Sequence, residues 1–156
     1  MYLTKKMIKI GGVILLMGFL FGCKEKFTIS DITYLEFRYS VGNWCDARVS
    51  YQLQLEDQVY TVSIKQKGIS EENADVFVVE KEFVKEIENV LNEYHVEKWN
   101  GFNKSDLNVL DGNDFDLYLK NSNNENLSAQ GYMKWPKNYN EVKNELDQIF
   151  MGLYRE

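Results

Sequence analysis

The chain contains few of the residue types on which metal sites and catalytic centres depend. Its 156 residues include two cysteines, one histidine and one proline. A zinc site takes three or four ligands from cysteine, histidine and carboxylate side chains, so this supply argues against one. The sequence also has no glycine-rich phosphate loop and no nucleophile-elbow motif of the kind that serine hydrolases use. We therefore expect no metal, no cofactor and no catalytic residue, and we interpret the protein as a non-enzyme.

Catalysis, if there were any, would depend on Cys45 and His95. A thiol and an imidazole can form a nucleophile and its base, and this pairing stays open as a hypothesis. The simpler interpretation makes Cys45 a small buried hydrophobic residue beside Trp44. His95 follows a predicted helix, where an imidazole complements the helix dipole.

Basic residues are also in short supply. The chain carries 18 lysines and arginines against 24 aspartates and glutamates, a formal net charge of −6. A chain of this sign is repelled by the phosphate backbone of nucleic acids. We therefore predict no nucleic-acid partner.

The one long apolar run lies at the start of the chain. Residues 10–22 are uncharged and follow Lys5, Lys6 and Lys9. A membrane-spanning helix takes about 20 apolar residues, whereas the apolar part of a signal peptide takes roughly 7–15. The run therefore predicts an export signal, with its lysines kept on the cytoplasmic side.

The run ends in Leu20-Phe21-Gly22-Cys23, which resembles the lipobox of bacterial lipoproteins. The resemblance implies a signal peptide of residues 1–22, cleavage before Cys23, diacylglyceryl attachment at Cys23 and acylation of the new amino group, often with palmitate. Two or three acyl chains anchor a protein stably where one is marginal. We expect a protein anchored through Cys23 to the bacterial cell membrane, on its extracytoplasmic side. The alternatives are an uncleaved signal anchor, a soluble secreted product, and a cysteine that follows a hydrophobic stretch by chance.

Cleavage would change the charge and the disulfide chemistry of the chain. Removing residues 1–22 takes away three lysines and no acid, which leaves 134 residues with 15 basic and 24 acidic side chains, a charge of −9. Acylation of Cys23 leaves Cys45 without a disulfide partner, whereas a free Cys23 would permit a Cys23–Cys45 bridge. We expect residues 23–31 to be the lipidated N-terminus and tether, and residues 32–156 to form a single α+β domain.

Hydrophobic periodicity predicts a β-β-β-α-β-β-α order. Apolar and polar residues alternate with the period of a half-buried strand in five stretches, and apolar residues recur at helical spacing in two. A loop or short irregular piece is expected over residues 69–78. We predict one antiparallel sheet with both helices packed on one face. The strands are expected at 33–41, 48–55, 60–65, 115–120 and 127–132, and the helices at 83–94 and 139–153, the second with a capping box made by Asn138 and Glu141.

The second half of the chain resembles a family of small, uncharacterised bacterial lipoproteins. In that family a helix is followed by a Trp-x-Gly-Phe loop, a Leu-Asp-Gly turn, a strand, and a glycine and a proline before the last helix. The resemblance covers residues 83–153 and implies the fold but no activity. It is carried by Trp99-Asn100-Gly101-Phe102, Leu110-Asp111-Gly112, Phe115-Asp116-Leu117, Gly131 and Pro136.

Three groups of residues are candidates for binding. An aromatic platform for a sugar or peptide would use Trp44, Trp99, Tyr132 and Trp135, although Trp99 and Phe102 are better explained as plugs at the end of the core. The oxygen-rich Asp111, Asn113, Asp114 and Asp116 lack the ligand spacing of a calcium loop, which favours a hairpin turn. The polar faces of the strands would share Tyr34, Glu36, Arg38, Arg48, Gln52, Lys65 and Tyr118, a mixture suited to docking a protein and equally found on any solvated face.

The sequence therefore favours a lipid-anchored module of the bacterial cell envelope that binds an envelope component or an extracellular protein without catalysis. The alternative is an inhibitor or immunity-type lipoprotein that acts against a hydrolase or toxin.

Overall fold

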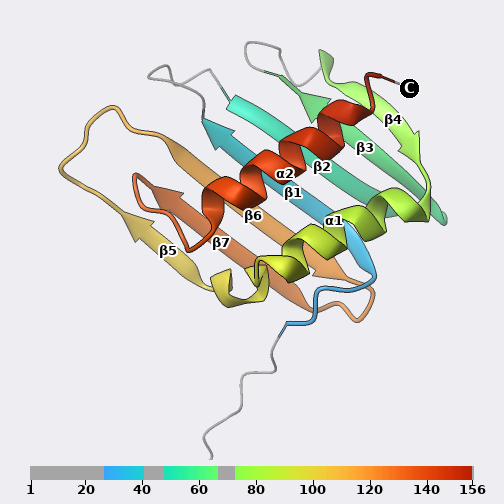
Figure 1. The fold of residues 1–156 in the computed structure, drawn as a ribbon, viewed down its shortest axis with the longest axis horizontal. Helices are drawn as coiled ribbons and strands as arrows, with labels where there is room; N and C mark the ends of the chain where they lie inside the picture. The colour runs from blue at the N-terminus through green and yellow to red at the C-terminus, as the bar shows by residue number, and fades with distance from the viewer. Residues whose placement is uncertain (1–26, 41–47, 67–72, 156) are drawn as a thin grey trace, which may run out of the picture.

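A computed structural model describes residues 27–40, 48–66 and 73–155. Within them, seven strands form one sheet in the order β4-β3-β2-β1-β6-β7-β5. Helices α1 (Lys81–Glu93) and α2 (Tyr139–Gly152) lie side by side over one face of this sheet (Figure 1). The predicted α+β class, with both helices on one face of a mostly antiparallel sheet, is confirmed.

The first three strands form the predicted antiparallel meander. They are β1 (Ile32–Ser40), β2 (Arg48–Glu56) and β3 (Val59–Lys65). Asp57 and Gln58 connect β2 to β3, and both have positive φ angles, 48° and 66°. Two such residues make the tight turn whose twist matches that of the flanking strands. Alternation in the sequence thus translates directly into alternate burial along these strands.

Two strands were not predicted. Residues 75–78 fall in the expected loop, yet β4 (Asp75–Val79) pairs with β3 along the edge of the sheet. β5 (Phe102–Ser105) pairs in parallel with β7 (Asn126–Tyr132), so the sheet is mixed rather than wholly antiparallel. Both are short edge strands that lack a polar–apolar alternation. The remaining strand, β6 (Asp114–Asn121), lies between β1 and β7.

The core fills the space between the helices and the sheet. Phe150 of α2 stacks on Tyr51 of β2, with ring centroids 4.4 Å apart. The short 3-10 helix η2 (Val96–Trp99) closes one end, where Trp99 is 3% exposed and its ring N–H donates to the carbonyl of Lys137 at 3.1 Å. The predicted role of Trp99 as a core plug is therefore confirmed.

The capping box predicted for α2 is wrong. Asn138 adopts a left-handed conformation, with φ 62° and ψ 20°, and its side chain makes no cap hydrogen bond. Its amide group instead donates to the carbonyl of Tyr94 at 3.4 Å. Asparagine is one of the residues that tolerates this conformation, so Asn138 turns the chain into the helix and fastens it to the end of α1.

The segment before β1 is packed against the domain in its described part. Phe27 and Ile29 are 5% and 4% exposed and belong to the core, so the lipidated N-terminus and tether predicted at residues 23–31 does not extend beyond residue 26 as a tether. The buried Asn121 amide donates to the carbonyl of Thr28 at 3.3 Å and to Glu125. The backbone N–H of Ser122 donates to the carbonyl of Asp31 at 2.9 Å. The β6–β7 turn thereby holds this segment in place.

A partly buried polar network fastens α2 to the sheet. One carboxylate oxygen of Asp147 accepts hydrogen bonds from the hydroxyls of Tyr39, at 2.6 Å, and Tyr51, at 2.9 Å. The other lies 2.7 Å from the Lys143 ammonium. Burial and the neighbouring carboxylate raise the pKa of both tyrosines, so their hydroxyls remain donors over the whole physiological range.

No helix in the described ranges has the length and apolar character needed to cross a bilayer.

Candidate functional site: the open face of the sheet

The helices leave one side of the sheet uncovered by other described elements, and we call this side the open face. Successive side chains of a strand point to opposite faces of the sheet, so residues opposite one another in register share a side. Glu36 pairs with Gln52 and Tyr118, and Arg38 with Ser50 and Asp116. The predicted sharing of one polar face is confirmed for all seven candidates. They are Tyr34, Glu36, Arg38, Arg48, Gln52, Lys65 and Tyr118.

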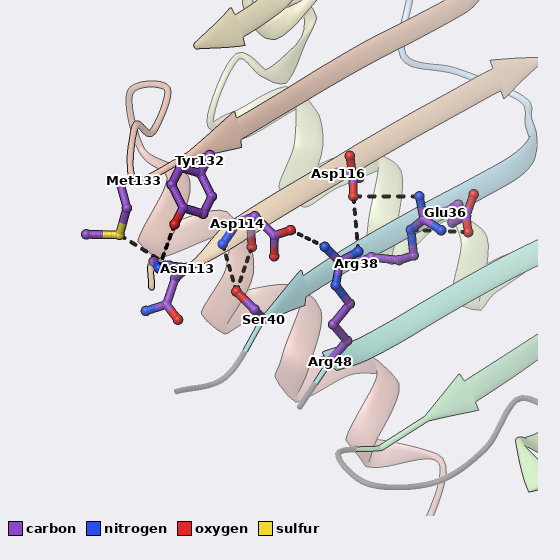
Figure 2. A network of polar contacts seen from close by, with 10 residues as sticks. Glu36, Arg38, Ser40, Arg48, Asn113, Asp114, Asp116, Tyr132 and Met133 are labelled. Carbon is purple, nitrogen blue, oxygen red and sulfur yellow. Dashed lines mark hydrogen bonds and ion pairs between the residues drawn. The ribbon is translucent and has the colours of Figure 1, made fainter. Parts of the chain in front are cut away.

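Five charged residues gather on the open face where β1 ends and β2 and β6 begin, and we call them the charged cluster. Arg38 lies 3.5 Å from Glu36 and 3.6 Å from Asp116 (Figure 2). Arg48 reaches the same Asp116 oxygen at 3.6 Å and also contacts Asp114. Three acids and two arginines leave the cluster with a formal charge of −1. The arginine side chains are 41% and 39% exposed, so the cluster is held together internally and still open to solvent.

Asp114 is fixed from both sides. Its backbone N–H donates to the hydroxyl of Ser40 at 2.7 Å, and that hydroxyl lies 3.4 Å from its carbonyl. The preceding residue, Asn113, donates its backbone N–H to the sulfur of Met133 (Figure 2). These contacts set the start of β6 and aim the Asp114 carboxylate at Arg48.

Three buried polar atoms lack a hydrogen-bond partner in the described part of the chain. They are Nε of Arg38 and one side-chain oxygen each of Asn113 and Asp114. A buried polar atom left without a partner costs roughly 1–3 kcal/mol, so such atoms are few in native proteins. Nε of Arg38 still lies 3.5 Å from Glu36 in an ion pair, whereas neither of the two oxygens has a donor within hydrogen-bond distance.

Shallow hollows surround the charged cluster. One, of about 380 Å³, lies toward β5 and is lined by Phe102, Asp116, Tyr118 and Gln130. A second, of about 410 Å³, lies over β2 and β3 beside Arg48 and Lys65. A third, of about 490 Å³, lies along Tyr34 and Tyr118. Glu36 lines all three, so the hollows form one continuous surface with the cluster at its centre.

Two tyrosines supply the apolar part of this surface. The rings of Tyr34 and Tyr118 meet edge to face with centroids 5.8 Å apart. Partial burial, with the charge of Glu36 second, raises the pKa of Tyr34 above its usual 10.0. Its hydroxyl therefore stays protonated and can donate a hydrogen bond.

The aromatic platform is not assembled from its described members. Trp99 is buried in the core, whereas Trp135 is 39% exposed and stacks on Tyr139 at 4.6 Å. The hydroxyl of Tyr132 accepts from the backbone N–H of Gly112 at 2.8 Å. Trp44 lies outside the described residues. Trp99 and Trp135 both contact Phe115 and Tyr139, so they belong to the packing at one end of the core rather than to an exposed platform.

The aspartates do not gather around a metal position. Asp114 and Asp116 face the two arginines, and no group of three or more histidine, cysteine or acidic side chains suited to a metal occurs among the described residues. The hairpin turn predicted at Asp111-Gly112 is wrong, because residues 106–113 form a longer loop between β5 and β6, two strands that do not pair with each other. Gly112 is needed there, since a Cβ would lie 2.4 Å from the Met133 side chain.

The catalytic pair is not brought together in the described structure. His95 is 63% exposed, has a φ of 57°, and lies 3.6 Å from Glu97 just after α1. Cys45 and the predicted lipid-attachment residue Cys23 both lie outside the described residues. Ser40 was not among the predicted site residues, because only the pairing of β1 with β6 brings its hydroxyl to the backbone of Asp114.

Comparison with models of protein families and with curated proteins found no match for this chain.

Proposed function

We propose that the protein is a lipoprotein of the bacterial cell envelope, anchored through Cys23 on the extracytoplasmic side, that binds a partner on the open face without catalysis. The anchor is supported by the lysine-flanked apolar run and its Leu20–Cys23 ending. The observation that carries the binding role is the charged cluster, because it combines two exposed arginines with an Asp114 carboxylate oxygen that has no hydrogen-bond partner.

The composition of the open face fits a protein-binding surface. Interfaces are enriched in tyrosine and arginine, and here Tyr34, Tyr118, Arg38 and Arg48 are neighbours. Acidic neighbours already hold both guanidinium groups, so less side-chain freedom is lost when a partner binds. The near-neutral cluster suits a mixed polar partner, such as the surface of an envelope protein.

A short tether would set the position of the domain on the membrane. Three residues separate Cys23 from the packed Phe27, a reach of roughly 14 Å at most. The segment at Phe27 lies beside the β6–β7 turn, and loop 106–113 lies at the other end of β6. The eight residues of β6 place these two ends roughly 25 Å apart. The turn would therefore face the membrane and the loop would point away from it.

That distal loop supports inhibition as a second candidate function. Leu107 and Leu110 are 89% and 93% exposed. The loop is nevertheless well held, since Lys134 lies 3.1 Å from Asp106 and lowers the pKa of that carboxyl group. A stable loop with exposed leucines, pointing away from the membrane, suits contact with a soluble hydrolase or toxin.

Photo-crosslinking in living cells tests the proposed function. A photoreactive amino acid replaces Gln52 on the open face, Leu110 in loop 106–113 or, as the matched control, the exposed Glu93 of α1. We expect a discrete crosslinked product from position 52 only, and its loss when Arg38→Glu is added. Crosslinks from Leu110 alone would favour the inhibitor role, and equal products from positions 52 and 93 would contradict both. Palmitate labelling that disappears in Cys23→Ser tests the anchor separately.

A further inference from the structure

A second hollow surface lies on the opposite side of the molecule. In Figure 1, α1 and α2 are closest near the end of α1 and spread apart toward the end of α2. Between them is a groove of about 550 Å³, closed at one side by Val78 and Val79 at the end of β4. We call it the helix groove. It is separated from the open face by the full thickness of the sheet.

The floor of the helix groove is apolar. Phe83, Ile149 and Leu153 line it, and each is half-buried and packed against the core. The ring of Phe83 meets that of Phe150 edge to face at 5.6 Å, so the floor is rigid. Ile149 and Leu153 are four residues apart, one helical turn, and present their side chains on the same face of α2.

The rim of the helix groove is acidic. Glu80, Glu82 and Glu86 from the α1 side are exposed, and Glu145 of α2 faces them. No lysine or arginine lines the groove. Lys85 lies 3.7 Å from Glu82 and offsets one charge, which leaves a surplus of three. The last turn of α2 also ends here without a basic residue, so its partly negative carbonyl end adds to the field.

We propose that the helix groove binds a basic amphipathic helix of a partner protein, with apolar side chains on the floor and lysines or arginines against the glutamates. Charge decides the class of occupant, because an acidic segment or a second copy of this acidic chain would be repelled. Helices that bind in grooves use apolar anchors one turn apart, and the floor offers a matching row. This site is additional to the open face and does not depend on the proposed function.

Fluorescence anisotropy with model peptides tests the proposal. The protein is the chain from residue 23 with Cys23→Ser, which retains every described core residue. The probe is a labelled amphipathic peptide of leucine and lysine, about 15 residues long so that it can form a helix. One comparison peptide carries glutamate in place of lysine, and another has the same composition with the leucines spread around the helix. We expect only the first peptide to bind in the micromolar range.

Matched charge reversals locate the binding. Glu86→Lys with Glu145→Lys changes the rim, whereas Glu93→Lys with Glu141→Lys changes two acids outside the groove on the same two helices. Both pairs alter the net charge equally. We expect the rim pair to weaken binding about tenfold or more and the control pair by less than about threefold. Circular dichroism checks folding, and Glu86→Gln with Glu145→Gln replaces the rim pair if it unfolds.

Equal weakening by both pairs would overturn the proposal, because it would indicate general electrostatic attraction. Binding of the glutamate peptide as tightly as the lysine peptide would overturn the acidic rim as the selecting feature. Equal binding of the spread-leucine peptide would overturn the helical occupant.

Discussion

Replacing Asp147 with alanine is expected to destabilise the domain by about 3 kcal/mol. The carboxylate accepts from two tyrosine hydroxyls at 2.6 and 2.9 Å, and these tyrosines, Tyr39 and Tyr51, are 5% and 2% exposed. Each buried hydroxyl left without an acceptor costs roughly 1–3 kcal/mol. Loss of the Lys143 ion pair adds about 0.3–0.5 kcal/mol, since both side chains are a quarter exposed.

A second variant separates the hydrogen bonds from the packing. Tyr39→Phe and Tyr51→Phe combined with Asp147→Leu remove donors and acceptor together, so no buried hydroxyl is left unpaired. We expect this triple variant to be more stable than Asp147→Ala alone. The assay is urea unfolding at pH 7, with midpoints compared at equal slope. A loss below about 1 kcal/mol for Asp147→Ala would refute the account of how α2 is held.

Three further predictions concern stability. Burial raises the pKa of Tyr39, Tyr51 and Tyr139, so these three side chains stay neutral in the folded state while they ionise near pH 10 in the unfolded chain. The free energy of unfolding should therefore be constant below pH 10 and fall above it by up to about 4 kcal/mol per pH unit. Urea midpoints from pH 8 to 11 measure this. Gly131→Ala should destabilise the domain by about 2 kcal/mol, because a Cβ would lie 2.1 Å from the Lys134 carbonyl oxygen. Gly152→Ala has open space around it and should stabilise α2 by up to about 1 kcal/mol. Similar melting temperatures for the two variants would contradict this prediction. Asn121→Ala should cost about 2 kcal/mol and expose the segment at Thr28 to proteases, which limited proteolysis followed by mass spectrometry checks.

The parts of the fold that follow from local pattern were predictable. Alternation located β1 to β3, and helical spacing located α1 and α2 to within two residues. β4 was not predicted because Asp75–Val79 contains consecutive apolar residues and no polar–apolar alternation. Two of its valines, Val76 and Val78, are 67% and 72% exposed on this edge strand. β5 has a single apolar residue, Phe102, and is defined by its pairing with β7 alone.

The candidate site was predictable in its residues but not in its arrangement. Strand alternation places Arg38 and Arg48 on the polar side of two strands that are adjacent in sequence. Asp114 and Asp116 complete the charged cluster only because β6 pairs with β1. These two strands are about 80 residues apart in the sequence, and no local pattern specifies their pairing. The lipid anchor at Cys23 stays a prediction from the sequence.

The central claim is that the open face is occupied in the cell. Maleimide labelling of single cysteines measures this directly, with Gln52→Cys on the open face and Glu93→Cys on α1, both in a Cys45→Ser background. Labelling rates on intact cells are divided by the rates on the purified protein. If a partner covers the open face, Gln52→Cys should react about tenfold more slowly in cells while Glu93→Cys is unchanged. Equal ratios at the two positions would contradict it.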